Sequence, residues 1–189
     1  YQRRVRVKGP FDTETSQELF SREITLDLRR EDAPEQEGIN ESILIKLISD
    51  TNRCILMLSS EQDLFFHYTC IIDETNLNEI ISEQNLIMQL GEFGSFMVKL
   101  LNSALRDPRS FVIVLFMSED GSSSLTVTEN FKNYKFLEII TLPFQISAEE
   151  VIRCDITTRY LKLKYENQEL STQYNQLQTA VKLKLPGLM

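Results

Sequence analysis

The chain has 189 residues, of which 42% are hydrophobic and 25% are charged, and its formal net charge is -8 at pH 7. Such a composition is ordinary for a globular protein and excludes a chain that is disordered throughout. The acidic balance argues against a nucleic-acid partner, because phosphate contacts need clustered Lys and Arg. The basic residues between positions 3 and 8 alternate with Val5 and Val7, which predicts the solvated face of a short strand.

The cysteines and the longest apolar runs bear on the compartment. The three cysteines, Cys54, Cys70 and Cys154, lie far apart in the sequence and form no CxxC pair. An odd number of scattered cysteines is not typical of a secreted disulfide framework, so we expect a reducing, cytoplasmic compartment. No apolar run approaches the ~20 residues of a membrane span, and no membrane partner is expected.

The first part of the chain has the pattern of an antiparallel sheet. Residues 24–28 alternate between apolar and polar, and residues 42–49, 54–58 and 64–72 are also rich in strand-forming side chains. Runs of this length, separated by turn residues, predict strands that pair with their neighbours. The acidic segment 31–40 is expected to be a loop.

The periodicity becomes helical after Asp73, a residue type that favours the N-cap position. Large apolar side chains then recur at helical spacing. Gly91 and Gly94 interrupt this stripe, and each costs about 1 kcal/mol relative to Ala inside a helix. We therefore expect two helices with a break near Phe93 and Gly94, the second ending before Pro108.

A β-rich stretch follows the helices. The continuous apolar run at 111–117 predicts a strand that is central and buried. Leu125 and Val127 then alternate with polar residues, until the segment 129–133 interrupts the alternation and a second β-rich run begins. Asn in this segment favours a turn, so Phe131 is expected in the middle of a hairpin turn that faces water.

The last segment has a different period. Ser147 and Glu150 have the spacing of a capping box, which predicts the start of a helix. Beyond them, seam residues recur at alternating intervals of four and three, as in a heptad repeat. The d positions are Ile156, Leu163, Leu170 and Leu177, and the a positions are Tyr160, Asn167, Tyr174 and Val181. Such a narrow seam predicts a coiled coil, since a core helix needs a wider apolar face.

Asn167 bears on how two such helices would pair. A buried Asn at an a position lowers stability but can bond its symmetry mate, which favours a parallel, in-register dimer. The tyrosines at two other a positions pack poorly, so we expect a weak dimer at this length. The alternative is a single long amphipathic helix that packs back on the globular part of the chain.

These elements define an expected fold and its division into domains. We expect an α+β protein with an antiparallel β-barrel or sandwich head, a helix pair inserted in it, and a long parallel coiled-coil helix after it. The predicted bounds are 1–145 for the head and 146–185 for the dimerisation helix, with 186–189 as a tail.

The sequence contains little that could carry catalysis. Its single histidine, His67, lies on a predicted strand, where a structural or surface role is far more common than a catalytic one. No Cys/His cluster has the spacing of a metal site, and no phosphate-binding or nucleophile motif is present. We therefore expect neither an enzyme nor a cofactor or metal site.

Several of these features resemble a known family. The segment "FFHYTCIIDETNLNEIISEQNLIMQLGEFGSFMVKLL" at 65–101 is similar to the core of spindle assembly abnormal protein six, the cartwheel protein of the centriole. The residues that fit the family pattern are Phe66, Tyr68, Gln84, Leu86, Phe93, Phe96, Leu100 and Leu101. Gly94 departs from the proline that is usual there. The run "TVTENFKNYKFLEI" resembles the family's hairpin, with Phe131 at the position of its apolar residue.

The resemblance implies a structural scaffold. The family dimerises through a parallel coiled coil and also head to head, through a hairpin whose apolar residue inserts into a pocket of the partner head. By this likeness the head–head interface contains Phe131, Asn130 and Lys132. The family closes into ninefold rings with coiled coils as spokes, in the cartwheel of the centriole and basal body. Its partners would be further copies of the chain and other centriolar assembly proteins.

Two relatives of this family stay open as alternatives. One is a DNA end-joining scaffold, which shares the head and coiled coil, and the other is a shorter cartwheel-protein-like paralogue. A DNA-binding scaffold should carry a basic patch, and the net charge of -8 speaks against it.

Overall fold

The computed structural model describes residues 9–11, 13–131 and 134–184, the last three of these without their side chains. The chain divides into two compact units, one of residues 11–148 and one that contains the C-terminal helix, and each is described by itself. The strand predicted around Val5 and Val7, the interface residue Lys132 and the tail at 186–189 lie outside the described residues.

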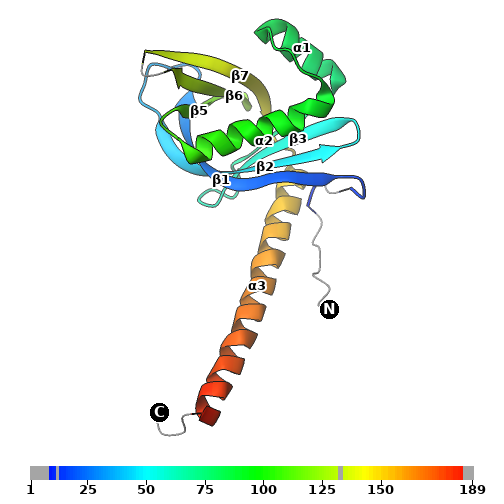
Figure 1. The fold of residues 1–189 in the computed structure, drawn as a ribbon, viewed down its shortest axis with the longest axis vertical. Coiled ribbons are helices and arrows are strands. Elements are labelled where there is room, and N and C mark those ends of the chain that lie inside the picture. Colours follow the sequence, from blue (N-terminus) through cyan, green and yellow to red (C-terminus); the bar gives the residue numbers. More distant parts are fainter. Residues whose placement is uncertain (1–8, 12, 132–133, 185–189) are drawn as a thin grey trace. The chain divides into compact units, whose positions relative to one another are not determined.

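Within the described residues the head is a closed barrel of seven strands with two helices inserted (Figure 1). The strands are β1 (Gln17–Arg30), β2 (Ile39–Asp50), β3 (Arg53–Ser60), β4 (His67–Ile72), β5 (Phe111–Met117), β6 (Ser122–Phe131) and β7 (Lys135–Ile146). They follow one another around the barrel in the order β1-β2-β3-β4-β7-β6-β5. Every neighbouring pair is antiparallel except β1 and β5, which close the barrel in parallel. The predicted α+β class is confirmed.

The barrel interior and one face of a helix form the core. Alternate residues of β2, namely Ile43, Ile45 and Leu47, are completely buried because successive strand residues point to opposite faces. Helix α2 (Leu90–Arg106) packs on β1, β2, β3 and β5, and it buries Phe93 and Met97 completely. Each such side chain contributes roughly 1.5–3 kcal/mol of burial free energy, so α2 is an integral part of the head.

The predicted break between the two helices was placed wrongly. Helix α1 (Glu74–Gln84) begins after Asp73, whose carboxylate accepts from the Asn76 N–H as predicted, and ends at Asn85 in the left-handed region, with φ 53°. Helix α2 then begins at Leu90 with a capping box between Gln89 and Glu92. Phe93 and Gly94 therefore lie inside α2.

Gly94 has a packing role that the helix period alone does not reveal. A Cβ at Gly94 would lie 2.7 Å from Cδ1 of Leu19 on β1. The absent side chain lets α2 approach the sheet closely, and this contact offsets the lower helix propensity of glycine. Tertiary packing thus keeps the helix continuous where local propensity predicts an interruption.

Two further predictions about the β-rich stretch also need correction. The strand β5 is central, but only Ile113 and Leu115 are buried on it, since its alternate residues face outward and are half-buried. Residues 129–131 are not part of a turn: β6 continues to Phe131, which pairs with Lys135 of β7.

The third helix, α3 (Glu149–Lys184), has 36 residues and would be about 54 Å long at ~1.5 Å per residue. The long helix is confirmed, but the capping box predicted before it is wrong. The Ser147 hydroxyl lies 2.7 Å from Nδ1 of His67 and also bonds the Thr69 hydroxyl, so its partners are on β4. His67 is buried in this contact, in agreement with a structural role.

Candidate self-association surfaces

The first candidate surface lies at the end of the hairpin formed by β6 and β7. Along β6, the row of side chains that faces the barrel interior contains Leu125 and Val127, which are completely buried. The same row continues through Glu129 to Phe131, because strand side chains alternate between the two faces. Phe131 is 50% exposed, so the hairpin extends beyond the core while keeping an apolar residue on its core-facing side.

The partners across the hairpin show which residues share a face with Phe131. Residues directly opposite each other on paired strands point to the same face. Lys135 lies opposite Phe131, and Leu137, which is 38% exposed, lies opposite Glu129. Phe136 lies opposite Asn130 and therefore points to the other face, where it is 61% exposed. The hairpin thus carries exposed apolar side chains on both faces.

Backbone hydrogen bonds hold the hairpin end in place. The Asn130 N–H donates to the Ser110 carbonyl at 2.7 Å, just before β5. The Tyr134 N–H donates to the Phe131 carbonyl at 2.9 Å and closes the turn. Because the Asn130 N–H and the Phe131 carbonyl are both hydrogen-bonded, the backbone at Phe131 is held in a defined orientation, which would lower the entropic cost of binding. Asn130, predicted as an interface residue, positions its neighbour through its backbone.

The second candidate surface is the heptad seam of α3. Leu163, Leu170 and Tyr174 are each 65% exposed, and Leu177 is 67% exposed in the single chain. The other seam positions range from half-buried Ile156 to exposed Tyr160, Asn167 and Val181. A row of large apolar side chains along one line of an otherwise polar helix is the pattern that pairs in a coiled coil.

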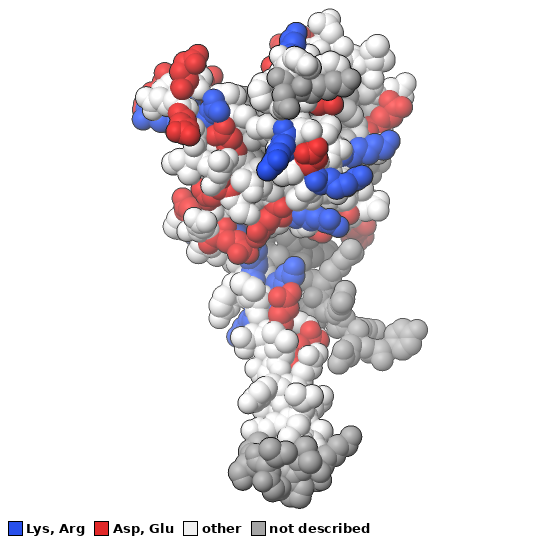
Figure 2. Space-filling model, turned by 60° about the vertical axis from the view of Figure 1, so that its left-hand side comes forward, with Lys and Arg blue, Asp and Glu red and all other residues white. Residues whose placement is uncertain are grey.

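Charges cover α3 unevenly. Its first turns carry acidic and basic side chains, including an ion pair of 2.6 Å between Glu149 and Arg153. Residues 170–181 contain no charged residue, and the corresponding part of the helix is white in Figure 2. Charged side chains beside the seam are therefore absent along residues 170–181.

A third region of the head combines a hollow with polar side chains. A hollow of about 600 Å³ lies between β1, the turn from β2 to β3 and the start of α2, lined by residues that include Leu19, Cys54 and Val98. Burial raises the pKa of the Cys54 thiol, which therefore stays protonated and is a poor nucleophile. The hollow consequently offers no reactive group from this cysteine.

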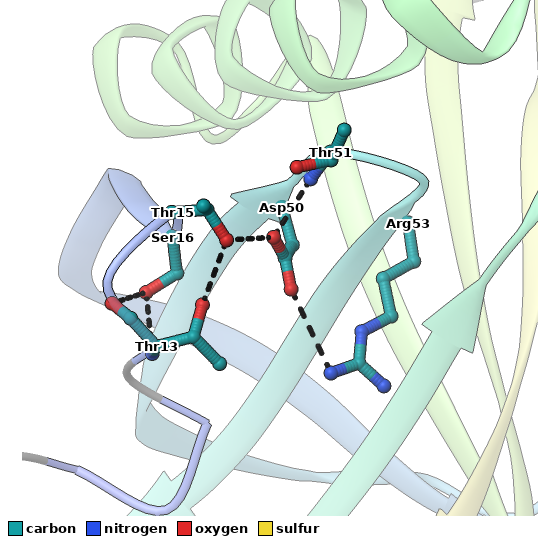
Figure 3. A network of polar contacts seen from close by, with 6 residues as sticks. All are labelled: Thr13, Thr15, Ser16, Asp50, Thr51 and Arg53. Carbon is teal, nitrogen blue, oxygen red and sulfur yellow. Dashed lines mark hydrogen bonds and ion pairs between the residues drawn. The ribbon is translucent and has the colours of Figure 1, made fainter.

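The polar side chains beside this hollow form a structural network (Figure 3). The Thr15 hydroxyl donates to Oδ1 of Asp50 at 2.7 Å, and the Thr51 N–H donates to the same oxygen at 2.8 Å. These bonds, with Arg53 3.7 Å from the other carboxylate oxygen, lower the pKa of Asp50. The carboxylate ties the segment before β1 to the β2–β3 turn and has no role as a proton donor at neutral pH.

The features of metal sites and of membrane-spanning helices are not found among the described residues. Among the described residues, no group of three or more His, Cys, Asp and Glu side chains is placed to hold a metal ion. In the same part of the chain, no helix is both long enough and apolar enough to cross a membrane. The two candidate surfaces, an apolar hairpin on the head and an apolar seam on a long helix, are typical of a protein that associates with other chains.

Comparison with known proteins agrees with that class. Residues 18–144 match the family model of the centriolar protein SAS-6 N-terminal domain. The chain therefore belongs to the SAS-6 N-terminal domain family, and the resemblance found in the sequence is confirmed. No sequence among the curated proteins matches the chain.

Solved structures show the same fold at low sequence identity. A Drosophila melanogaster Sas-6 fragment superposes with a TM-score of 0.79 at 14% identity, over 94% of this chain and 88% of the fragment. A Leishmania SAS-6 fragment gives a TM-score of 0.77 at 14% identity, over 92% and 98% of the two chains. A C. elegans SAS-6 fragment gives 0.65 at 13% identity, over 84% and 94%.

Sequence reasoning missed part of the hairpin surface. It singled out Phe131 but placed it in a turn, and it did not identify Leu137, Phe136 and Tyr134 as exposed neighbours. The alternation from Leu125 onward could have shown that Phe131 occupies a core-facing position. The exposure of these residues depends on where the core ends, which only the packed barrel reveals.

Proposed function

We propose that this protein is a self-assembling scaffold of the centriolar cartwheel that uses two different contacts between copies. The first is a parallel coiled coil formed by the seam of α3. The second joins two heads through Phe131, with Asn130 and Lys132 beside it. The observation that carries the proposal is Phe131 itself, a half-exposed aromatic residue that continues a core-facing row and whose carbonyl accepts from the Tyr134 N–H.

The solved relatives support the coiled-coil contact. The Drosophila fragment is dimerised via its coiled-coil domain, and the C. elegans fragment is a coiled-coil dimer. The seam of α3, from Ile156 to Val181, has the heptad spacing that such a dimer needs and stays exposed in the single chain. Self-association through α3 follows as the proposal for this chain.

Two contacts of this kind would generate a larger assembly. Each is isologous, so each pairs two copies about a twofold axis, and a protomer with two such axes propagates until the angle between them closes a ring. We infer a ninefold ring in the centriole or basal body from the resemblance to the cartwheel family. Other centriolar assembly proteins would bind this scaffold in the cytoplasm.

The two contacts are expected to differ in strength. Burial of Phe131 contributes roughly 1.5–3 kcal/mol per ring, whereas association costs about 4–15 kcal/mol in lost freedom of motion. A head–head contact built around this residue is therefore weak by itself. Assembly would depend on the coiled coil and on ring closure, which raise the effective concentration of neighbouring heads.

The hairpin provides a sharp test with its own control. Phe131→Glu is expected to remove every species larger than the α3 dimer in sedimentation velocity runs over a concentration series. Phe136→Glu places the same charge on the same hairpin but on the opposite face, and it should leave the larger species in place. Equal loss of assembly in both variants, or no loss with Phe131→Glu, would contradict the proposal.

The match to a centriolar family favours the cartwheel over a DNA end-joining scaffold. The two remain separable by experiment. A gel-shift assay with linear duplex DNA at low salt should show no retardation by the full chain, because the net charge of -8 repels the phosphate backbone. Retardation that weakens with added salt would support the DNA-binding alternative.

A further inference from the structure

The edge of β7 that faces away from β6 has few strand partners. β7 pairs with β6 along nearly its whole length, through residues 135–145. On its other side it meets β4 only where Tyr68 lies opposite Ile146 and Thr69 lies opposite Gln145. The backbone groups along most of this outer edge therefore need partners other than β4.

The register shows which residues of β7 direct their backbone groups outward. The Asn130 N–H points toward Ser110, away from β7, so the neighbouring Glu129 and Phe131 direct theirs toward β7. Their partners Leu137 and Lys135 consequently bond β6. By alternation along an antiparallel strand, Phe136 and Glu138 direct their N–H and C=O groups to the outer edge. A register shift at Ile139 inserts one extra residue, so the outward positions beyond it are Thr141, Pro143 and Gln145.

In the half of the edge nearer the end of β7, three different features take the place of a neighbouring strand: a side-chain amide, a proline and a short pairing with β4. The Gln84 side chain of α1 donates to the Thr141 carbonyl at 2.7 Å and accepts from the Thr141 N–H at 2.8 Å, so one amide replaces a neighbouring strand. Pro143 has no N–H to leave unpaired. Gln145 is opposite Thr69 of β4. Thr141 and Gln145 are thus paired, and the outward N–H at Pro143 is absent.

The half of the edge nearer the hairpin turn is open. Within the part of the chain that the structure describes, the backbone groups of Phe136 and Glu138 have no hydrogen-bond partner. Apolar side chains flank them on both faces, since Phe136 and Tyr134 are largely exposed and Leu137 is 38% exposed. An open edge with apolar side chains above and below it is the surface to which an added strand binds.

We propose that the edge of β7 at Phe136 and Glu138 binds an extended segment of another protein as an additional strand. The segment would exchange backbone hydrogen bonds with these two residues. Its apolar side chains, at alternate positions, would lie against Leu137 on one face, and the positions between them would lie beside Phe136 and Glu138 on the other. A Lys or Arg beside Glu138 would match the local charge and the net charge of -8.

A second copy of this chain fits the edge less well. Two β7 edges paired about a twofold axis at Leu137 would set Phe136 of each copy opposite Glu138 of the other. This arrangement makes the two Glu138 side chains diagonal neighbours on one face of a short contact, about 7–8 Å apart, where the two carboxylates repel each other. The proposed site uses the backbone of β7 and does not depend on the contact made by Phe131.

The test removes one outward backbone N–H of β7 and keeps the hydrogen bonds between β6 and β7. Glu138→Pro deletes the outward N–H of residue 138 in the way that Pro143 already lacks one, while Glu138→Ala deletes the same side chain and keeps the N–H. Both variants lose the 2.6 Å bond between the Thr141 hydroxyl and the Glu138 carboxylate, so they form a matched pair. Proline suits residue 138 because Leu137, before it, is already extended.

The probe is a fluorescein-labelled peptide of sequence Thr-Val-Lys-Val-Lys-Val-Thr, titrated with the full chain by fluorescence anisotropy. The peptide should bind wild type and Glu138→Ala, and its dissociation constant should rise at least tenfold for Glu138→Pro. Amide exchange by NMR should show slower exchange at Phe136 and Glu138 only when the peptide is present. Equal binding to both variants, or no binding to wild type, overturns the proposal.

A further measurement separates the peptide site from self-association. Glu138→Pro should leave the sedimentation profile of the full chain unchanged, because the proposed partner is another protein. If Glu138→Pro abolishes the larger species as Phe131→Glu is expected to do, the edge belongs to a contact between copies and the strand-addition proposal is wrong. Loss of assembly with Phe131→Glu alone leaves the strand-addition proposal intact.

Discussion

The barrel and α3 differ in how they satisfy their apolar residues. In the barrel, rows such as Ile43, Ile45 and Leu47 are completely buried by the chain itself. In α3, Leu163 and Leu170 are each 65% exposed although they repeat just as regularly. Periodicity therefore identifies an apolar face, but a single chain covers that face only where other elements fold over it. The head buries its apolar rows within one chain, whereas in the proposed assembly α3 would gain its packing energy from a second copy.

In the hairpin of β6 and β7, a row of side chains that is buried inside the barrel continues into a part of the strand where the side chains are exposed. A single row of β6 passes from completely buried Val127 to half-exposed Phe131. The backbone pairing continues to Phe131 and Lys135, so the row keeps its direction beyond the completely buried residues. The head thus combines a buried core with a half-exposed apolar end, where we propose that a second head binds.

The largest expected effect comes from the core side of this comparison. Phe93→Ala removes a completely buried ring from α2 and should lower the free energy of unfolding by about 3–5 kcal/mol, because a cavity remains among its neighbours. Urea denaturation followed by circular dichroism measures it. Phe65→Ala is the control, since Phe65 is 73% exposed and should change stability by less than about 0.5 kcal/mol. Similar losses in both variants would show that the head core is misassigned.

A change in the seam should affect association and leave the head intact. Leu170→Ala keeps a good helix former but removes a d-position side chain, so the dimer dissociation constant should rise at least tenfold, which is about 1.4 kcal/mol. Sedimentation equilibrium measures the constant. Ser171→Ala, one residue away from the seam, serves as the control. A dimer that is unchanged in Leu170→Ala would show that the contact does not use this seam, and a monomeric wild type would favour the alternative of a single amphipathic helix.

The smallest expected effect is a difference in alkylation between a cysteine in the core of the head, Cys70, and one on α3, Cys154. Burial raises the pKa of Cys70 to about 12, whereas Cys154 is half-buried. Iodoacetamide at pH 8 should therefore alkylate Cys154 first and reach Cys70 only in urea, as peptide mass spectrometry would show. Because the folded thiol keeps its proton while the unfolded thiol ionises above a pKa of about 8.5, this residue lowers stability as pH rises past that value. Early alkylation of Cys70 would mean that the barrel opens readily.

Local patterns were sufficient to predict much of this protein. The period of two at 24–28 and the helical period after Asp73 depend on neighbours within a few residues, and the structure has β1 and α1 there. The heptad seam predicted α3 in the same way. The resemblance carried by residues 65–101 led to the correct family because it rests on the order of core residues.

Predictions failed where a distant residue decided the outcome. The sequence by itself determined the periods of the strands and helices and the position of the α3 seam. Only the tertiary structure decided that Gly94 stays inside α2, against Leu19, and that Ser147 bonds His67 instead of capping a helix. It also decided where the core ends along β6 and which half of the β7 edge stays open. These outcomes depend on contacts between residues far apart in the chain, and such contacts leave no signature in the local period.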